Sequence, residues 1–379
     1  MNPVLVCRLA SESSRSLAGG KAAGLGELIR AGLPVPPGFV VLAGAFGEMM
    51  GAVDPAGALR RSVASLDPGD VSSVARVAAG VRERIRSWPL PADVAAQITG
   101  AYFALGAPGA AGPAGAAGAA GAAGAAGAVP VAVRSSATGE DSAAASFAGL
   151  QDTYLGVRGP AAVLDAVRRC WASLYNDESV AYRRRFGLPE DGLAMAVVVQ
   201  RMVRPRAAGV MFTRSPVTGD RSVVAIEGTW GLGSALVAGE VTPDRFTVSK
   251  VTGEITGRQV GAKLRLHSFT PNEPGISSSA TPLALRGRPC LTDDEARALA
   301  SVGCRVEEHY GLPQDIEWAL VGGLPGADPA ALLGGDPAGR IRLLQSRPET
   351  VWAARSHDPV ATPKPRASDH VLAWLEKPL

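Results

Sequence analysis

Apolar residues recur along this chain at two spacings, one typical of helices and the other of strands. The helical spacing is clear in three stretches, residues 21–31, 161–174 and 293–310. Thr292 precedes the third stretch and Glu295 follows three residues later, which is the capping-box pattern of a helix N-terminus. We therefore expect a long helix to begin at residue 293.

Short runs rich in β-branched residues predict strands. They lie at residues 129–133, 195–199, 209–213, 223–227, 246–249, 315–320 and 341–347. A Gly- and Pro-rich stretch separates the last two, and it predicts an enlarged hairpin loop between them. The first run is expected to end before Arg134, so that Arg134 begins a polar loop of small residues that extends to Gly149.

Two segments carry no such pattern. Residues 106–128 are almost wholly Gly and Ala, with too little Pro for collagen. With no large side chain to bury and much backbone entropy to lose, this tract is expected to be a flexible surface insertion. Residues 355–379 are expected to form a linker and tail.

Composition and charge exclude some classes of function. The chain has 379 residues, 46% of them hydrophobic and 19% charged, enough for a large core in about two or three lobes. The net charge is +3 and the arginines are scattered, so no nucleic-acid partner is expected. No apolar run approaches the roughly 20 residues of a membrane helix, and four cysteines without CxxC spacing favour a reduced, cytoplasmic setting.

The last two predicted strands carry the strongest candidate chemistry. Residues two apart in a strand share a face, so Asp315 projects with Glu317, and Gln345 with Arg347. Antiparallel pairing would bring these polar faces together. Unpaired buried charges are costly in a core, whereas carboxylate and amide oxygens suit Mg²⁺.

Three basic residues are candidate phosphate ligands. Arg134 and Arg347 can bind phosphate oxygens in a fork. Lys21 is the only lysine before Lys250 in a chain whose basic residues are mostly arginine. The small residues of the loop after Arg134 would let backbone N–H groups approach phosphates.

Each of these residues also fits a plainer role. Lys21 could be a solvated surface lysine and Arg134 a structural ion-pair partner. Asp315 and Glu317 could pair with arginines across a sheet as well as hold a metal. Gly19-Gly20-Lys21 is not a Walker loop, because Arg15 stands where its first glycine belongs and Ala22 follows the lysine.

Seven short segments form a specific pattern when they are taken in their order along the chain. They are residues 19–22 with 35–39, 133–149, 199–203, 209–212, 230–233, 315–318 and 345–348. Together they resemble the N-terminal nucleotide-binding domain of the pyruvate phosphate dikinase and phosphoenolpyruvate synthase family, across most of residues 13–354. The resemblance implies an α+β, ATP-grasp-like fold whose two or three lobes clamp ATP with mixed or antiparallel sheets. The expected parts are an N-terminal lobe (1–105), the insertion (106–128), a phosphate-loop lobe (129–200), a C-terminal lobe with the metal site (201–354) and the tail.

The resemblance also implies roles for particular residues. Lys21, Arg134 and Arg347 would be catalytic, with Arg347 on the transferring phosphoryl group. Glu317 and Gln345 would hold Mg²⁺, with Asp315 as a further candidate ligand. The remaining ATP contacts would come from a phosphate loop and an adenine hinge: Thr138, Gly139, Gln200, Met202 and Val203.

Members of this family use ATP to phosphorylate a histidine on a swivelling domain, releasing AMP and passing the γ-phosphate to water or phosphate. This sequence has no Thr-Ser-His segment of that kind. We therefore expect the ATP-binding component of a dikinase whose phosphohistidine domain and acceptor-binding domain are encoded separately. The alternatives are a non-catalytic ATP-binding regulatory subunit and an ATP-grasp ligase acting through an acyl phosphate.

Overall fold

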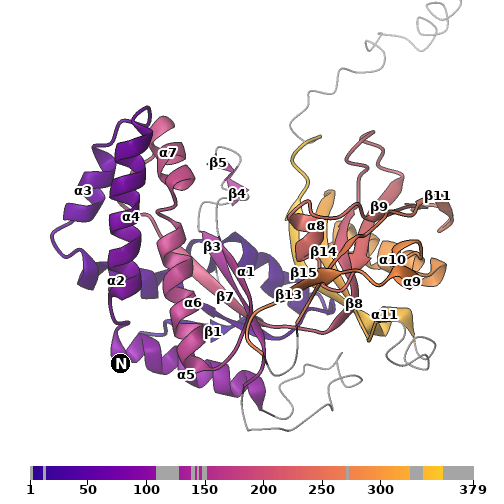
Figure 1. Ribbon diagram of the computed structural model, residues 1–379, viewed down its shortest axis with the longest axis horizontal. Helices are drawn as coiled ribbons and strands as arrows, with labels where there is room; N and C mark the ends of the chain where they lie inside the picture. Colours follow the sequence, from indigo (N-terminus) through magenta and orange to yellow (C-terminus); the bar gives the residue numbers. More distant parts are fainter. Residues whose placement is uncertain are drawn as a thin grey trace, which may run out of the picture.

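The computed structural model describes residues 3–11, 14–107, 128–137, 141–142, 145–146, 152–269, 273–324 and 336–352. The fold is α+β, built on two antiparallel sheets that lie side by side, with a group of helices beside each (Figure 1). The predicted Gly/Ala insertion falls almost wholly outside the described residues, and so does the predicted tail.

The first sheet has five strands in the order β1-β2-β7-β3-β6, and every neighbouring pair is antiparallel. Its strands are β1 (Val6–Arg8), β2 (Gly38–Val41), β7 (Met195–Arg201), β3 (Val131–Ala137) and β6 (Thr153–Val157). Along β7, Val197 and Val199 join one hydrophobic core, whereas Ala196 and Val198 join another. Both faces of this sheet are therefore covered, as the continuous apolar run in β7 indicates.

Six helices share the larger core on one face of the first sheet, where three of them pack on the strands and the other three pack mainly on helices (Figure 1). They are α2 (Ala43–Val53), α3 (Ala58–Ala64), α4 (Val71–Ser87), α5 (Ala92–Gly106), α6 (Pro160–Ser173) and α7 (Asp177–Arg185). The other face packs on α1 (Arg15–Arg30), through Ala18, Ala22 and Leu25. Leu28 of the same helix enters the core of the second sheet, so α1 is packed against both halves of the molecule.

The second sheet has six strands in the order β11-β10-β9-β8-β14-β15, again all antiparallel. They are β11 (Ile255–Gln259), β10 (Asp244–Ser249), β9 (Val223–Trp230), β8 (Pro205–Phe212), β14 (Gln314–Val321) and β15 (Ile341–Pro348). The sheet packs against α10 (Asp293–Tyr310), and Trp318 and Trp230 are buried in that core as anchors. Three residues, 202–204, connect β7 of the first sheet to β8 of the second.

Smaller elements complete the second half. A hairpin of β12 (Arg265–Ser268) and β13 (Ser277–Ala280) lies beside α8 (Ser234–Val237), and α9 (Leu283–Arg286) precedes α10. The short helix α11 (Pro337–Arg340) leads directly into β15. Two further two-residue strands, β4 (Asp141–Ser142) and β5 (Ala145–Ser146), pair with each other.

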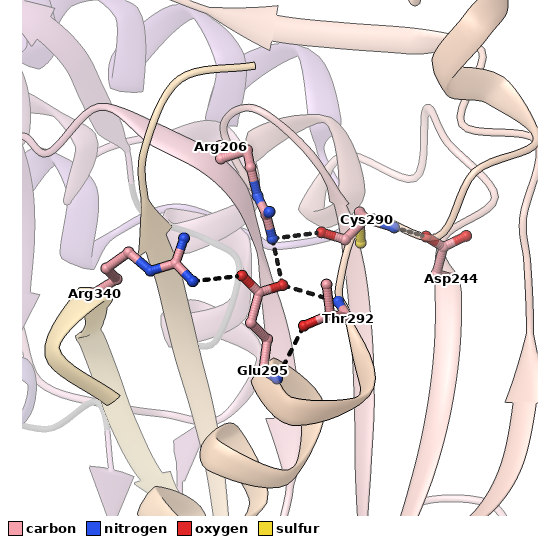
Figure 2. A network of polar contacts seen from close by, with 6 residues as sticks. All are labelled: Arg206, Asp244, Cys290, Thr292, Glu295 and Arg340. Atoms are coloured by element: carbon pink, nitrogen blue, oxygen red, sulfur yellow. Dashed lines mark hydrogen bonds and ion pairs between the residues drawn. The ribbon is translucent and has the colours of Figure 1, made fainter. Parts of the chain in front are cut away.

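A polar network ties α10 and the start of β15 to the sheet (Figure 2). The carboxylate of Glu295 accepts hydrogen bonds from Arg206 of β8 and, at 3.0 Å, from Arg340 of α11. The predicted capping box is present, since Thr292 Oγ1 accepts from the Glu295 amide and Glu295 accepts from the Thr292 amide. One carboxylate thus joins three elements and places the strand that carries Gln345.

Most of the predicted elements occur, with shifted ends. The helix predicted at 293–310 matches α10, and the strands predicted at 315–320 and 341–347 form the antiparallel pair β14 and β15. One prediction was wrong: Arg134 does not leave its strand for a loop, because β3 continues to Ala137 through its pairing with β7. No described helix is long and apolar enough to span a membrane.

Candidate functional site

The predicted polar faces of β14 and β15 do meet. Glu317 lies opposite Gln345, and Asp315 lies opposite Arg347. The neighbouring residues of β14, Ile316 and Trp318, point the other way into the core of the second sheet. The four polar side chains are therefore on the face of the sheet that the α10 core does not use.

A β-bulge at Leu344 makes this arrangement possible. Trp318 lies opposite Leu343 and Glu317 lies opposite Gln345, so Leu344 is an extra residue in β15. Strict alternation from the buried Leu343 would have pointed Gln345 into the core. The extra residue reverses the alternation and turns Gln345 and Arg347 to the polar face.

Arg134 reaches this face from the other sheet. Its Nη2 lies 2.7 Å from Glu317 Oε2 and 2.7 Å from Gln345 Oε1, and its Nη1 lies 2.9 Å from the carbonyl oxygen of Leu344. The Arg134 side chain is 12% exposed and that of Glu317 is 30% exposed. Three oxygens, from a carboxylate, an amide and a bulge carbonyl, thus converge on one guanidinium and join the two sheets.

Arg347 forms the second ion pair of the face. Its Nε lies 3.3 Å from Asp315 Oδ2, and its side chain is 48% exposed. Burial raises the pKa of Asp315, Arg347 lowers it and Glu349 raises it, and the net pKa lies above the usual value. Arg347 is therefore held at one end and open to solvent elsewhere, which suits a group that meets a ligand.

The helix segment that carries Lys21 is hydrogen-bonded to β3, the strand that carries Arg134. Helix α1 is kinked at Gly19, where φ is +75°, and the helix resumes just before Lys21. Ser136 holds both sides of this kink: its hydroxyl donates to the carbonyl of Ala18 at 2.9 Å and accepts from the amide of Ala22 at 3.2 Å. The start of the second helical segment and Arg134 therefore have a common support in β3.

The predicted hinge lies where β7 leaves the first sheet for the second. The Gln200 side chain is buried, and its Nε2 donates to the carbonyl of Pro36 at 3.2 Å, so that amide is engaged within the protein. The amide of Met202 donates to the carbonyl of Pro130 at 2.9 Å. Met202 Sδ accepts from the amide of Gly156 at 2.9 Å. The Gln200 amide group and the Met202 backbone amide are thus engaged within the protein, and the adenine contacts of Gln200, Met202 and Val203 stay predictions.

Two predicted ATP ligands, Thr138 and Gly139, lie outside the described residues. Of the other predicted site residues, the structure brings Arg134, Glu317 and Gln345 into direct contact, and it pairs Asp315 with Arg347. Lys21 and the hinge segment are placed beside β3 and β7. These placements leave the ligand roles of all of them as predictions.

The donor set around Arg134 fits a hard cation. The described residues contain no group of three His, Cys, Asp or Glu side chains that could hold a metal ion. The oxygens that converge here are of mixed kinds, and Mg²⁺ accepts carboxylate and amide oxygens together with phosphate. The sequence did not indicate the Leu344 carbonyl or the contact of Ser136 with the kink of α1, because a bulge and a helix kink leave little local signal.

Comparison with known proteins places most of the chain in one family. A family model described as "Pyruvate phosphate dikinase, AMP/ATP-binding domain" matches residues 15–368. The chain is 41% identical over 334 residues to a probable phosphoenolpyruvate synthase of Methanothermobacter thermautotrophicus, covering 88% of this chain and 44% of that protein. It is 44% identical over 306 residues to a rifampicin phosphotransferase of a Streptomyces species, covering 80% and 32%.

A phosphoenolpyruvate synthase of Aeropyrum pernix shows 36% identity over 374 residues, covering 92% of this chain and 42% of that protein. The chain thus spans less than half the length of each of these three relatives.

Proposed function

Because this chain belongs to the pyruvate phosphate dikinase AMP/ATP-binding domain family, we propose that it is the ATP-binding component of a dikinase-type phosphotransferase. It binds Mg·ATP between its two sheets, in an ATP-grasp-like clamp, and phosphorylates a histidine on a separate partner protein. The β-phosphoryl group goes to the histidine and the γ-phosphoryl group goes to water, so AMP and phosphate are the other products.

The observation that carries this proposal is the contact of Arg134 with Glu317 and Gln345 across the two sheets. A guanidinium that can bind phosphate and a pair of oxygens that can bind Mg²⁺ are already adjacent. A nucleoside triphosphate needs both, because its phosphates carry charge that must be neutralised before transfer.

Each residue of the site has a distinct task in this proposal. Lys21 and Arg134 bind and orient the phosphates, and Arg347 binds the phosphoryl group that moves. Glu317 and Gln345 would hold Mg²⁺, with Asp315 orienting Arg347 beside them. Bound there, Mg²⁺ would neutralise negative charge on the phosphate oxygens. The backbone around Val203 would contact adenine.

The receiving histidine is proposed to belong to another protein. The two described histidines that make polar contacts are engaged elsewhere: His267 bonds Ser234 and lies near Glu240, and His309 lies near Glu27. The relatives named above include proteins named for phosphoenolpyruvate and for rifampicin. The proposal leaves the final acceptor open between small molecules of such kinds.

ATP labelled separately at the β- and γ-phosphates tests the function directly. The protein is incubated with each label and with candidate partners that carry a swivelling-domain histidine. We expect AMP, β-label on the partner histidine and γ-label in phosphate. ADP formation that depends on an added carboxylate and amine would instead indicate a ligase, and tight ATP binding without turnover would indicate a regulatory subunit.

Two variants connect the reaction to the site. Glu317→Gln and Arg347→Ala are expected to reduce AMP formation by at least about 100-fold, since the first removes the charge proposed to hold Mg²⁺ and the second removes the charge proposed to bind the transferred phosphoryl group. Arg297→Gln is the matched control, because Arg297 pairs with Asp294 at 3.0 Å on the exposed side of α10, the helix that packs on the opposite face of the sheet. Unchanged AMP formation in both site variants would rule out this assignment.

A further inference from the structure

Arg134 contacts the oxygens of Glu317 and Gln345 that a bound metal ion would also contact. Its Nη2 is the shared donor to Glu317 Oε2 and Gln345 Oε1, both at 2.7 Å. Its Nη1 donates a hydrogen bond to the carbonyl oxygen of Leu344, the bulge residue. The oxygens best suited to a divalent cation are therefore already bound by a positive charge that belongs to the protein.

From this geometry we propose that Arg134 neutralises the charge of Glu317 while no nucleotide is bound. In this position it prevents a metal ion from binding Glu317 and Gln345 until a nucleotide binds. The inference rests on the proposed function for the identity of the ligand, Mg·ATP. A divalent cation and a guanidinium cannot share the same oxygens, because their charges repel at such short range. Metal bound at Glu317 and Gln345 thus requires Arg134 to move away.

The nucleotide provides the reason for Arg134 to move. A guanidinium taken from a carboxylate needs another anion, and phosphate oxygens bind it in a fork. Within the described residues, the buried Nε of Arg134 has no hydrogen-bond acceptor, so its present contacts leave one donor unused. A triphosphate beside β3 could bind that donor as well as the two Nη groups.

The exchange couples the two ligands. Arg134 moves from Glu317 to phosphate, and the vacated oxygens become available to the metal that accompanies the same phosphates. Metal alone then binds weakly and nucleotide raises the metal affinity, and by linkage the metal raises nucleotide affinity equally.

Manganese serves as the probe, because free Mn²⁺ is measured by electron paramagnetic resonance. Nucleotide-free wild-type protein, Arg134→Gln and Arg297→Gln are titrated with Mn²⁺ under identical conditions. We expect Arg134→Gln to bind one Mn²⁺ at least about tenfold more tightly than wild type, and Arg297→Gln, which changes an exposed pair on α10, to match wild type. The double variant Arg134→Gln/Glu317→Gln should lose the gain, which assigns the metal to this site.

Wild-type Mn²⁺ affinity equal to that of a folded Arg134→Gln would overturn the exchange. Thermal unfolding of the wild type gives a test that needs no variant. Mn²⁺ should raise Tm only when the β,γ-imido analogue of ATP is present. An equal rise with Mn²⁺ alone contradicts the proposal.

The two proposals fail separately. If the metal effect occurs but no partner histidine is phosphorylated and no AMP forms, the dikinase function is wrong and the exchange stands. If AMP forms while nucleotide-free wild type binds Mn²⁺ as tightly as Arg134→Gln, only the exchange is wrong.

Discussion

Gly275 donates its backbone amide to the carbonyl of Gly156 at 3.0 Å, and this bond joins the β12–β13 hairpin of the second half to β6 of the first sheet. Gly156 has φ of +71°, and a Cβ built on it would lie 2.2 Å from the carbonyl oxygen of Gly275. Its amide also bonds Met202, beside the connection between the sheets. A second link between the halves therefore lies next to the predicted adenine segment.

Gly156→Ala is expected to break that link and to weaken ATP binding as well as stability. The unfavourable φ alone costs about 1–2 kcal/mol, and the collision with backbone adds to it. Gly253→Ala is the matched control, since Gly253 has the same φ of +71° and open space where the Cβ would lie. Calorimetric ATP binding and denaturant unfolding of both variants give the comparison, and equal losses would show that the contact with Gly275 has no role.

Glu295→Gln is expected to be among the most destabilising single changes in the second half. The substitution leaves Arg206 buried without its carboxylate and weakens the contact of Arg340 (Figure 2). Breaking a buried ion pair by removing one partner costs about 3–5 kcal/mol. Glu227→Gln, in the exposed pair with Arg245, should cost at most about 1 kcal/mol in the same urea titration. A similar small loss for both would contradict the structural importance of the network.

Asp54 should make stability depend on acid pH. Its carboxylate accepts the amides of Leu59 and Arg60, both at 3.1 Å, at the start of α3. Burial raises the pKa of Asp54. These two amides and the Arg60 guanidinium together lower the pKa by more than burial raises it, so the net pKa lies below the usual value. A lowered pKa gives stability that is present above the unfolded-state pKa and is lost as pH falls through the folded-state pKa.

Asp54→Asn is therefore expected to lower the free energy of unfolding by about 1–2 kcal/mol at pH 7. The gap from wild type should shrink below about pH 4, where the wild-type carboxylate also begins to lose its charge. Urea unfolding at pH 7, 5 and 3.5 measures it. A gap that stays constant over this range would mean that the charge of Asp54 contributes nothing.

Lys21→Met should weaken ATP binding by about tenfold, which is the loss of about 1.4 kcal/mol. The loss for AMP should be smaller, because a point charge aimed at the outer phosphates has less to bind in a monophosphate. Lys250→Met removes a lysine just after β10 that pairs with Glu307 of α10, and it should leave both affinities unchanged. Equal losses of ATP and AMP affinity in Lys21→Met would move Lys21 away from the outer phosphates.

Much of the fold was predictable because its signals are local. The capping box of Thr292 and Glu295 satisfies helix-end amides within four residues, so α10 was recognisable from its own segment. The end of β3 was not, because Arg134 to Ala137 are held in the strand by β7, some sixty residues later. The domain boundaries and the ATP contacts of Thr138 and Gly139 stay predictions.

The sequence by itself predicted a set of site residues, and it determined that Asp315 and Glu317, like Gln345 and Arg347, share a face, since strand periodicity is a local property. Only the tertiary structure decided that the two faces meet. Counting from the buried Leu343, simple alternation points Gln345 into the core, and the bulge at Leu344 reverses it. The partner of Glu317 was also undecided in the sequence, because the ion pair with Arg134 joins residues 183 positions apart on different sheets. Such contacts depend on how the sheets pack, and no local pattern encodes that.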